Sequence, residues 1–223
     1  MPCWLSGNST IFVMWRGKPL RGFESHTRLH FFVIIVIFIC TMADTNYHSI
    51  SDQTNVTLKD ITVDPRSTGV DPATIDDVLK LSHAQNILIE RLIVDAGGLQ
   101  KENAIDMNRM CSQVSIIDAK LVSGLQNAIT IKGGCYDILI ENVIIIPGKG
   151  SCDIELGNWS DQSQDYVTNV TLKNVTRNDG QPVRLRVGHA KEPTIIGGNV
   201  KRDFLGSLMV KAYWQLKKWG VMK

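Results

Sequence analysis

One short pattern of residues recurs along most of the chain and restricts the folds it can adopt. Each copy begins with Asn or a similar polar residue, continues with alternating β-branched residues, and reaches an Asp or Asn before a second apolar pair. The copies start 24 to 32 residues apart and read NVTLKDITVD from Asn55, NILIERLIVD from Asn86, QVSIIDAKLV from Gln113, DILIENVIII from Asp137, NVTLKNVTRN from Asn169 and a degraded TIIGGNVKRD from Thr194. A copy this short cannot bury its own apolar face, so the copies must stack on one another.

Within each copy the apolar residues alternate with a period of two, which is the period of a β-strand. This alternation predicts ladders of inward-facing aliphatic side chains on successive turns, formed by Ile87 and Ile89, Val114 and Ile116, Ile138 and Ile140, and Val170 and Leu172. A second ladder is predicted at a tight turn, where Asn and Asp are favoured. Its members are Asp60, Arg91, Asp118, Asn142 and Asn174.

The N-[IV]-x-[IL]-x-[ND]-[VI] rungs resemble those of pectate-lyase-like right-handed β-helix proteins, a family that includes polysaccharide lyases, glycoside hydrolases and phage tailspikes. The resemblance covers about 150 of the 223 residues and concerns residues that build the fold, not a site. It implies an all-β fold, a right-handed parallel β-helix of about five to six rungs with short capping helices. A leucine-rich repeat is disfavoured because the chain has no LxxLxLxxN string, and no helix of ordinary length separates the strands as a βαβ fold requires.

The chain divides into three predicted segments. Residues 42–203 form the β-helix domain, and residues 204–223 form a C-terminal helix that caps the coil or mediates oligomerisation. A third, less favoured interpretation of this helix is a membrane-surface helix, indicated by Lys211, Lys217, Lys218 and Lys223 beside Trp214 and Trp219. A second short helix is predicted over residues 72–82, with Thr74 as its cap.

Residues 1–41 are expected to lie outside the fold, with two interpretations. The apolar run at residues 31–40 fits the core of a signal peptide loosely and is too short for a membrane span. Alternatively, RGFESH at residues 21–26 resembles the translated T-arm of a transfer-RNA gene, and FFVIIVIFI resembles a translated A/T-rich spacer. We favour this second interpretation, in which the segment is non-native and translation starts at Met42.

Charge and cysteine content exclude several classes of function. A formal net charge of +2 is too small for nucleic-acid binding. The five cysteines lack CxxC spacing, so neither a zinc site nor a disulfide framework is predicted. We therefore expect no cofactor, no metal and no nucleic-acid partner, and membrane contact is not favoured.

A shorter second strand follows the middle copies, at AIDMN from Ala104, AITIKGG from Ala128, DIELGNW from Asp153 and VRLRVGH from Val183. Alternation along these strands predicts an exposed polar strip of two outward ladders. One ladder contains Asp106, Thr130, Glu155 and Arg184, and the other contains Asn108, Lys132 and Arg186.

The resemblance implies that sugar-cleaving relatives use carboxylates and basic groups on one face of the coil. Asp106 and Glu155 are the candidate catalytic residues, because a separation of two rungs, about 9.6 Å, falls at the inverting end of the range for hydrolase carboxyl pairs. The candidate ligand-binding residues are Asn108, Thr130, Lys132, Arg184 and Arg186. His189 is expected to be a surface histidine near this strip.

Three functions remain open. The favoured one is a non-catalytic β-helix module of phage or mobile-element origin, a virion, tail or surface component that contacts a polysaccharide or cell-surface glycan. The alternative is a small polysaccharide lyase or glycoside hydrolase that uses Asp106, Glu155, Lys132 and Arg184. The second alternative is a structural assembly protein that forms a homotrimer through its Trp-rich C-terminus. The expected location of the protein depends on its origin. A phage protein would lie in the virion or on the cell surface, and the protein would be extracellular if the N-terminal segment is a signal peptide.

Overall fold

The structure is a computed structural model, and it describes residues 47–158 and 165–221. The segment 1–41 and the proposed start at Met42 lie outside the described residues.

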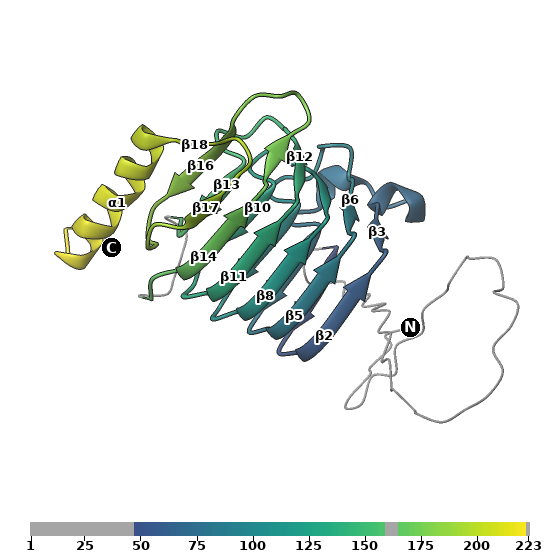
Figure 1. Ribbon diagram of the computed structural model, residues 1–223, viewed down its shortest axis with the longest axis horizontal. Helices are drawn as coiled ribbons and strands as arrows, with labels where there is room; N and C mark the ends of the chain where they lie inside the picture. The colour runs from purple at the N-terminus through teal and green to yellow at the C-terminus, as the bar shows by residue number, and fades with distance from the viewer. Residues whose placement is uncertain (1–46, 159–164, 222–223) are drawn as a thin grey trace, which may run out of the picture.

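Three parallel sheets wind around one axis to form a β-solenoid of about five turns (Figure 1). Sheet A contains, in order, β1 (His48–Ser51), β4 (Leu79–Ser82), β7 (Ile105–Asn108), β10 (Ile129–Ile131), β13 (Ile154–Leu156), β16 (Val183–Val187) and β18 (Val200–Arg202). Sheet B contains β17 (Thr194–Ile196), β14 (Thr168–Lys173), β11 (Tyr136–Glu141), β8 (Ser112–Ile117), β5 (Gln85–Glu90) and β2 (Thr54–Lys59). Sheet C contains β15 (Thr176–Arg177), β12 (Ile144–Ile146), β9 (Lys120–Val122), β6 (Ile93–Val94) and β3 (Thr62–Val63).

The core is the set of aliphatic ladders that the repeat predicts. Val114, Ile138 and Val170 occupy the same register position in β8, β11 and β14, and the residue two places further on in each strand also faces inward. All of these side chains are buried. Burying one large aliphatic side chain contributes roughly 1.5–3 kcal/mol, so the stacked ladders account for why the coil holds together without disulfides.

The turn between sheets B and C carries the predicted polar ladder, and its backbone explains the residue choice. Asp60, Arg91, Asp118, Asn142 and Asn174 all have φ between 52° and 56°, the left-handed region that Asn and Asp tolerate best. Nδ2 of Asn142 donates to Oδ1 of Asp118 at 2.9 Å, and Nδ2 of Asn174 donates to Oδ1 of Asn142 at 3.1 Å. The ladder therefore joins successive turns by side-chain hydrogen bonds.

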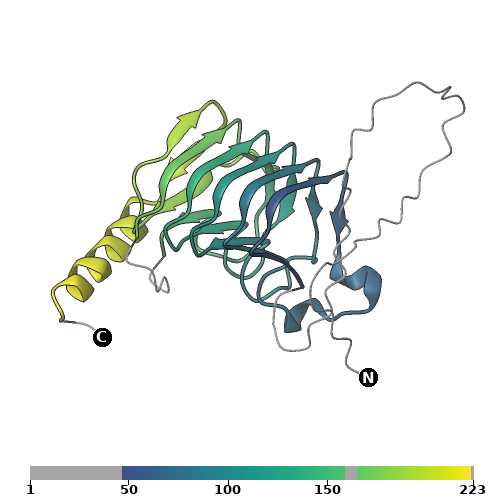
Figure 2. The same cartoon turned by 90° about the horizontal axis from the view of Figure 1, so that it is seen from below.

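The helix predicted over residues 72–82 is wrong. Only Pro72–Thr74 form a 3₁₀ turn (η2), and it is capped by Asp71, whose carboxylate accepts from the Ala73 N–H. The following residues Leu79–Ser82 form β4, in which Leu79 and Leu81 face the core and pair with β7. Leucines two residues apart fit the strand period, and in the neighbouring turn they pair with Ile105 and Met107, which are also buried. A second 3₁₀ turn, η1 (Pro65–Thr68), lies near the same end of the coil (Figure 2).

The single α-helix of the described residues, α1 (Phe204–Lys218), lies across the C-terminal end of the coil (Figures 1 and 2). Asp203 caps its first turn by accepting from the Gly206 N–H at 3.0 Å. Oγ of Ser207 accepts from the backbone N–H of Val187 at 2.9 Å, which ties the helix to the end of β16. None of the helices in the described part of the chain has the length and apolar character needed to cross a membrane.

Candidate functional site

The outer face of sheet A carries the residues predicted to form the polar strip. Asp106, Thr130 and Glu155 occupy one register position in β7, β10 and β13, so the two carboxylates lie two rungs apart as predicted. Arg186, and not Arg184, is the next member of this ladder, and Arg184 pairs with Lys201 of β18 instead. The predicted alignment is therefore wrong by two residues at β16, a shift that keeps both arginines on the outer face because side chains alternate.

The predicted second ladder forms in part. The Lys132 N–H donates to the backbone oxygen of Met107 at 2.9 Å, which places Lys132 on the turn above Asn108 as predicted, whereas Arg186 belongs to the first ladder. Lys132 lies beyond the end of β10, and its side chain turns back toward Asp106. Nζ of Lys132 is 3.0 Å from Oδ1 of Asp106, and Nδ2 of Asn108 donates to Oδ2 of the same carboxylate at 2.9 Å. These two candidate ligand-binding residues are thus brought together around a candidate catalytic one.

The strip is not exposed as predicted, because Asp106 is 0% and Glu155 is 5% accessible to solvent. Polar residues that precede the strands direct their side chains onto the same face. Oδ1 of Asp77 accepts from Nδ2 of Asn103 at 2.8 Å, and Oδ1 of Asn103 accepts from Oγ1 of Thr130 at 2.8 Å. We call this cluster the outer-face network; its members are Asp77, Asn103, Asp106, Asn127, Thr130, Lys132, Glu155 and Arg186.

The network continues along the coil to α1. The side-chain amide of Asn127 lies 3.0 Å from Oγ1 of Thr130 and 3.3 Å from Oε2 of Glu155. Nη1 of Arg186 donates to Oε1 of Glu155 at 3.3 Å, while its Nε and Nη2 donate to Oδ2 of Asp203 at 3.1 and 3.0 Å. Arg184 is held separately by Asp153, with Nη2 3.1 Å from Oδ1. Each candidate site residue is therefore engaged by another part of the protein.

Burial shifts the titration of several network groups. It raises the pKa of Asp77 to about 7, and the nearby charge of Asp106 adds to the shift. Burial also raises the pKa of Glu155, against the opposing charge of Arg186. For Lys132, burial disfavours the charged form, but the neighbouring Asp106 carboxylate outweighs it and the pKa is raised. The network is thus a buried set of acids partly compensated by two cations, a closed arrangement rather than a carboxyl pair open to substrate.

Sequence reasoning missed Asp77, Asn103 and Asn127. A signal for them exists, since each lies two residues before the first residue of its strand in sheet A. This common position places them at equivalent points of successive turns. The pattern was hidden because the spacing between copies varies, so these residues do not align when the first strands of the copies are superimposed.

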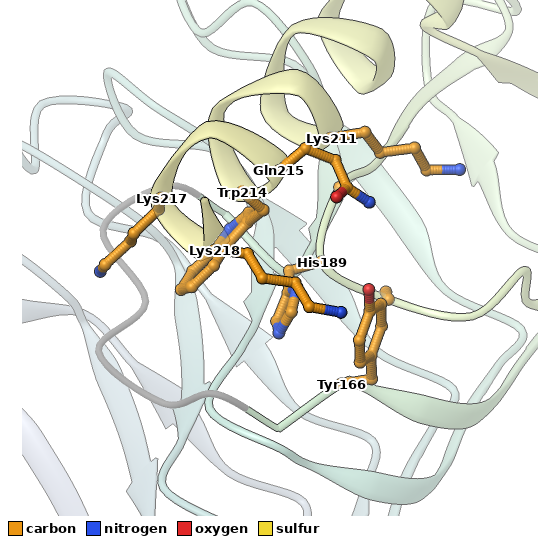
Figure 3. Close-up of a pocket in the computed structure, with 9 residues that line it drawn as sticks. Tyr166, His189, Lys211, Trp214, Gln215, Lys217 and Lys218 are labelled. Carbon is orange, nitrogen blue, oxygen red and sulfur yellow. The ribbon is translucent and has the colours of Figure 1, made fainter. Parts of the chain in front are cut away.

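An open pocket of about 400 Å³ lies between α1 and the end of the coil (Figure 3). His189 forms its floor and is buried, not a surface residue as predicted, because its ring packs between two others. The ring centroid of His189 is 4.0 Å from that of Tyr166 and 4.2 Å from that of Trp214. Nε1 of Trp214 donates to the backbone oxygen of Asn158 at 3.1 Å, and Nζ of Lys217 lies 4.7 Å from the Trp214 ring centroid.

The pocket combines one accessible aromatic ring with several cations. Tyr166 is 51% exposed, and in Figure 3 Lys218 extends from α1 toward it. The described lining residues include three lysines and no acidic residue: Tyr166, Gly188, His189, Ala190, Lys211, Trp214, Gln215, Lys217 and Lys218. The sequence indicates capping, assembly or membrane-surface roles for the C-terminal tryptophans and does not connect Trp214 with Tyr166 or His189, which are distant in the chain.

Within residues 47–158 and 165–221, no group of His, Cys, Asp and Glu side chains is placed to hold a metal ion. No protein-family model, curated protein or solved structure matches the chain. The function must therefore be argued from the geometry of the chain itself.

Proposed function

We propose that the protein is a non-catalytic β-helix module that contacts carbohydrate, with the pocket between α1 and the coil as its binding site. The observation that carries the proposal is the combination of the exposed Tyr166 ring with the lysines of α1 around one open pocket. The C–H face of a sugar ring packs against an aromatic ring, and a few polar groups around such a ring fix the orientation of the ligand.

The charge of the pocket indicates an acidic carbohydrate. Lys211, Lys217 and Lys218 line it without a lining carboxylate, and Lys211 alone of the three is paired, with Glu192 beside the pocket at 3.4 Å among the described residues. Ammonium groups bind carboxylate and sulfate by charge-assisted hydrogen bonds, which are stronger than those between neutral partners. A polysaccharide that contains uronic acid or sulfated sugars is therefore the proposed ligand class.

The geometry supports binding over catalysis. The candidate carboxylates Asp106 and Glu155 are buried and engaged by Lys132 and Arg186, whereas a hydrolase must present both carboxyl groups to the glycosidic bond. The alternative of a lyase or hydrolase would require these ion pairs to open before substrate could enter.

We further propose that the chain is related to pectate-lyase-like right-handed β-helix proteins and serves as a virion, tail or cell-surface component of phage or mobile-element origin. The parallel solenoid and the N-[IV]-x-[IL]-x-[ND]-[VI] rungs support the relation. The segment that resembles a translated transfer-RNA gene supports the origin, because mobile elements often integrate beside such genes.

A panel of acidic and neutral polysaccharides tests the proposal, with binding and product release measured on the same samples. We expect binding to acidic members without product release, and a roughly tenfold weaker affinity for Tyr166→Ala, which removes the stacking face. Tyr136→Ala is the matched control, because Tyr136 is a partly exposed tyrosine on β11 that does not line the pocket. Its affinity should equal that of the wild type.

Two outcomes would contradict the proposal. Product release that is abolished in the double variant Asp106→Asn/Glu155→Gln would establish the enzyme alternative. An absence of binding across the panel, together with a homotrimer in light scattering, would instead favour the structural assembly protein.

A further inference from the structure

Helix α1 exposes an apolar face on the side turned away from the coil. We call this the outer face of α1; it consists of Leu205, Leu208, Met209, Ala212 and Trp219, which recur at helical spacing. Leu205 and Trp219 are 67% and 70% exposed, and Leu208 and Met209 are 53% and 55% exposed. The opposite side is also apolar and packs on the coil through Val210 and Trp214. A helix that is apolar on both sides is normally covered on both sides.

The outer face of α1 contains no charged residue, and the lysines of the helix lie on its other side. At 100° per residue, Lys211 falls about 60° and Lys217 and Lys218 about 80° beyond the ends of the outer face, toward the side that packs on the coil. Nζ of Lys217 lies 4.7 Å from the Trp214 ring centroid, and Nζ of Lys211 lies 3.4 Å from Oε1 of Glu192. No acidic residue occurs between Phe204 and Lys218. An exposed apolar face with lysines on the polar side is the arrangement of helices that lie in the surface of a membrane.

This end of the molecule also concentrates positive charge. Between Lys191 and Val221 there are six lysine and arginine residues and two acidic residues, a net charge of +4, whereas the whole chain has +2. Both views place α1 at the very end of the coil, so its outer face is directed away from the rest of the coil (Figures 1 and 2). The C-terminal end of the coil therefore carries both an excess of positive charge and an exposed apolar helix face.

A hollow of about 590 Å³ beside the first turn of α1 combines the two kinds of group. Lys201 lines it from the coil, with Asp203 and two arginines that are paired elsewhere, Arg184 with Asp153 and Arg202 with Glu192. Phe204, Leu205 and Met209 line it from the helix. A phosphate group with hydrocarbon attached would contact Lys201 and the arginines on one wall and apolar side chains on the other.

We propose that α1 binds the surface of an anionic lipid bilayer, with its outer face at the boundary between headgroups and acyl chains. The axis of the coil then points away from the membrane. The cations of the hollow contact the lipid phosphates. A second copy of the chain is a poorer occupant of the same face, because two such ends, each with a net charge of +4 between Lys191 and Val221, would repel one another. A membrane-surface helix was the least favoured interpretation of the sequence, because the spacing of apolar residues does not reveal which side of the helix the coil covers.

The test is sedimentation of the full chain with lipid vesicles. We expect binding to an equimolar mixture of phosphatidylcholine and phosphatidylglycerol, little binding to phosphatidylcholine alone, and a loss of binding as salt is raised. The double variant Leu208→Gln/Met209→Gln should lower the partition coefficient by at least about tenfold, since two apolar side chains no longer enter the bilayer. Lys201→Gln should weaken binding less, and only to the anionic vesicles.

Matched controls come from the wall of the coil, where Ile144 and Lys120 are exposed and paired on sheet C. Ile144→Gln and Lys120→Gln should bind vesicles as the wild type does. Because all of these side chains are exposed, the circular dichroism of every variant should match that of the wild type.

Equal binding to neutral and anionic vesicles would overturn the proposal, as would unchanged binding of the double variant. A dimer or trimer in sedimentation equilibrium that the double variant loses, without vesicle binding by the wild type, would overturn it and assign the outer face to a second copy. The variants avoid Tyr166 and the pocket lysines, so the result is independent of carbohydrate binding.

Discussion

Asp77 shows how a single buried acid makes the stability of this protein depend on pH. Its carboxylate accepts from the backbone N–H and the side-chain amide of Asn103, and burial together with Asp106 raises its pKa to about 7. In the unfolded chain an Asp carboxyl titrates near 3.9. The folded state therefore binds more protons than the unfolded state between about pH 4 and pH 7, so this group lowers the free energy of unfolding as pH rises through that window.

We expect Asp77→Asn to be more stable than the wild type above pH 7, because the amide keeps the hydrogen-bond acceptor and carries no charge. The difference should be on the order of a few kcal/mol and should shrink toward zero near pH 4. Urea unfolding at a series of pH values measures it, with Asp76→Asn at the neighbouring half-exposed position as the control.

The difference between variant and wild type is the informative quantity. Burial lowers the pKa of His48, so this group makes stability rise with pH below its ordinary value of 6.5 and opposes the effect of Asp77. A difference between Asp77→Asn and the wild type that does not change with pH would contradict the assignment of the titration to Asp77.

At the scale of elements, α1 is attached to the coil through few side chains. Only Ser207, Val210 and Trp214 of this helix are buried, and Trp214 supplies both the ring stack on His189 and the hydrogen bond to the Asn158 backbone. An isolated helix of 15 residues is marginal in water. The helix therefore depends on the Trp214 contact, whereas the coil does not depend on the helix for its ladders.

We expect Trp214→Ala to release α1 while the coil stays folded, because truncating a buried aromatic side chain costs about 3–5 kcal/mol. Trypsin should then cut at Lys211 and Lys217 much faster than in the wild type, and helical circular dichroism should fall without loss of the strand signal. Trp214→Phe keeps a ring but loses the hydrogen bond and should be intermediate.

Trp219→Ala provides the matched control, since Trp219 is the exposed C-cap residue of the same helix. Cleavage at wild-type rates in Trp214→Ala would show that other contacts hold α1 in place. Loss of the strand signal in that variant would show instead that the coil requires the helix.

The elements also show what the sequence could and could not predict. The inward ladders and the turn at Asn142 and Asn174 were predictable because a period of two and a left-handed backbone both restrict residue type locally. The pairing of Glu155 with Arg186 was not, since the register of β16 depends on the length of the loop before it. The burial of Asp106 was not predictable either, because Lys132 and Asn108 were predicted beside it on the same face, and only their side-chain conformations show that they close over its carboxylate.

At the scale of the whole molecule, each turn of the coil is bonded only to its neighbours. Turns in the middle have a partner on both sides, and β2 and β17 at the two ends of sheet B have a partner on one side only. Stability in such a stack is approximately the sum of contributions from each turn and each interface between turns. Opening should therefore begin at the ends and spread inward.

We expect Ile140→Ala in the middle of sheet B to destabilise the whole coil by about 2–5 kcal/mol, because the cavity it leaves has buried neighbours on both sides. Val56→Ala in β2 should instead speed hydrogen exchange mainly in the first turn. Native-state hydrogen exchange resolved by strand distinguishes the two, and a uniform response to both variants would show that the coil opens as one unit.

Because each turn is bonded only to its neighbours, a mechanical force on the molecule acts on one interface between turns at a time. A pull on the last turn is resisted by the hydrogen bonds of one interface between turns, and the turns further back are strained only after that interface yields. Each released turn of 24 to 32 residues adds roughly 90 Å of extended chain. A coil that is anchored at one end and pulled at the other would thus lengthen in steps. It would dissipate mechanical work at every step instead of unfolding in a single event.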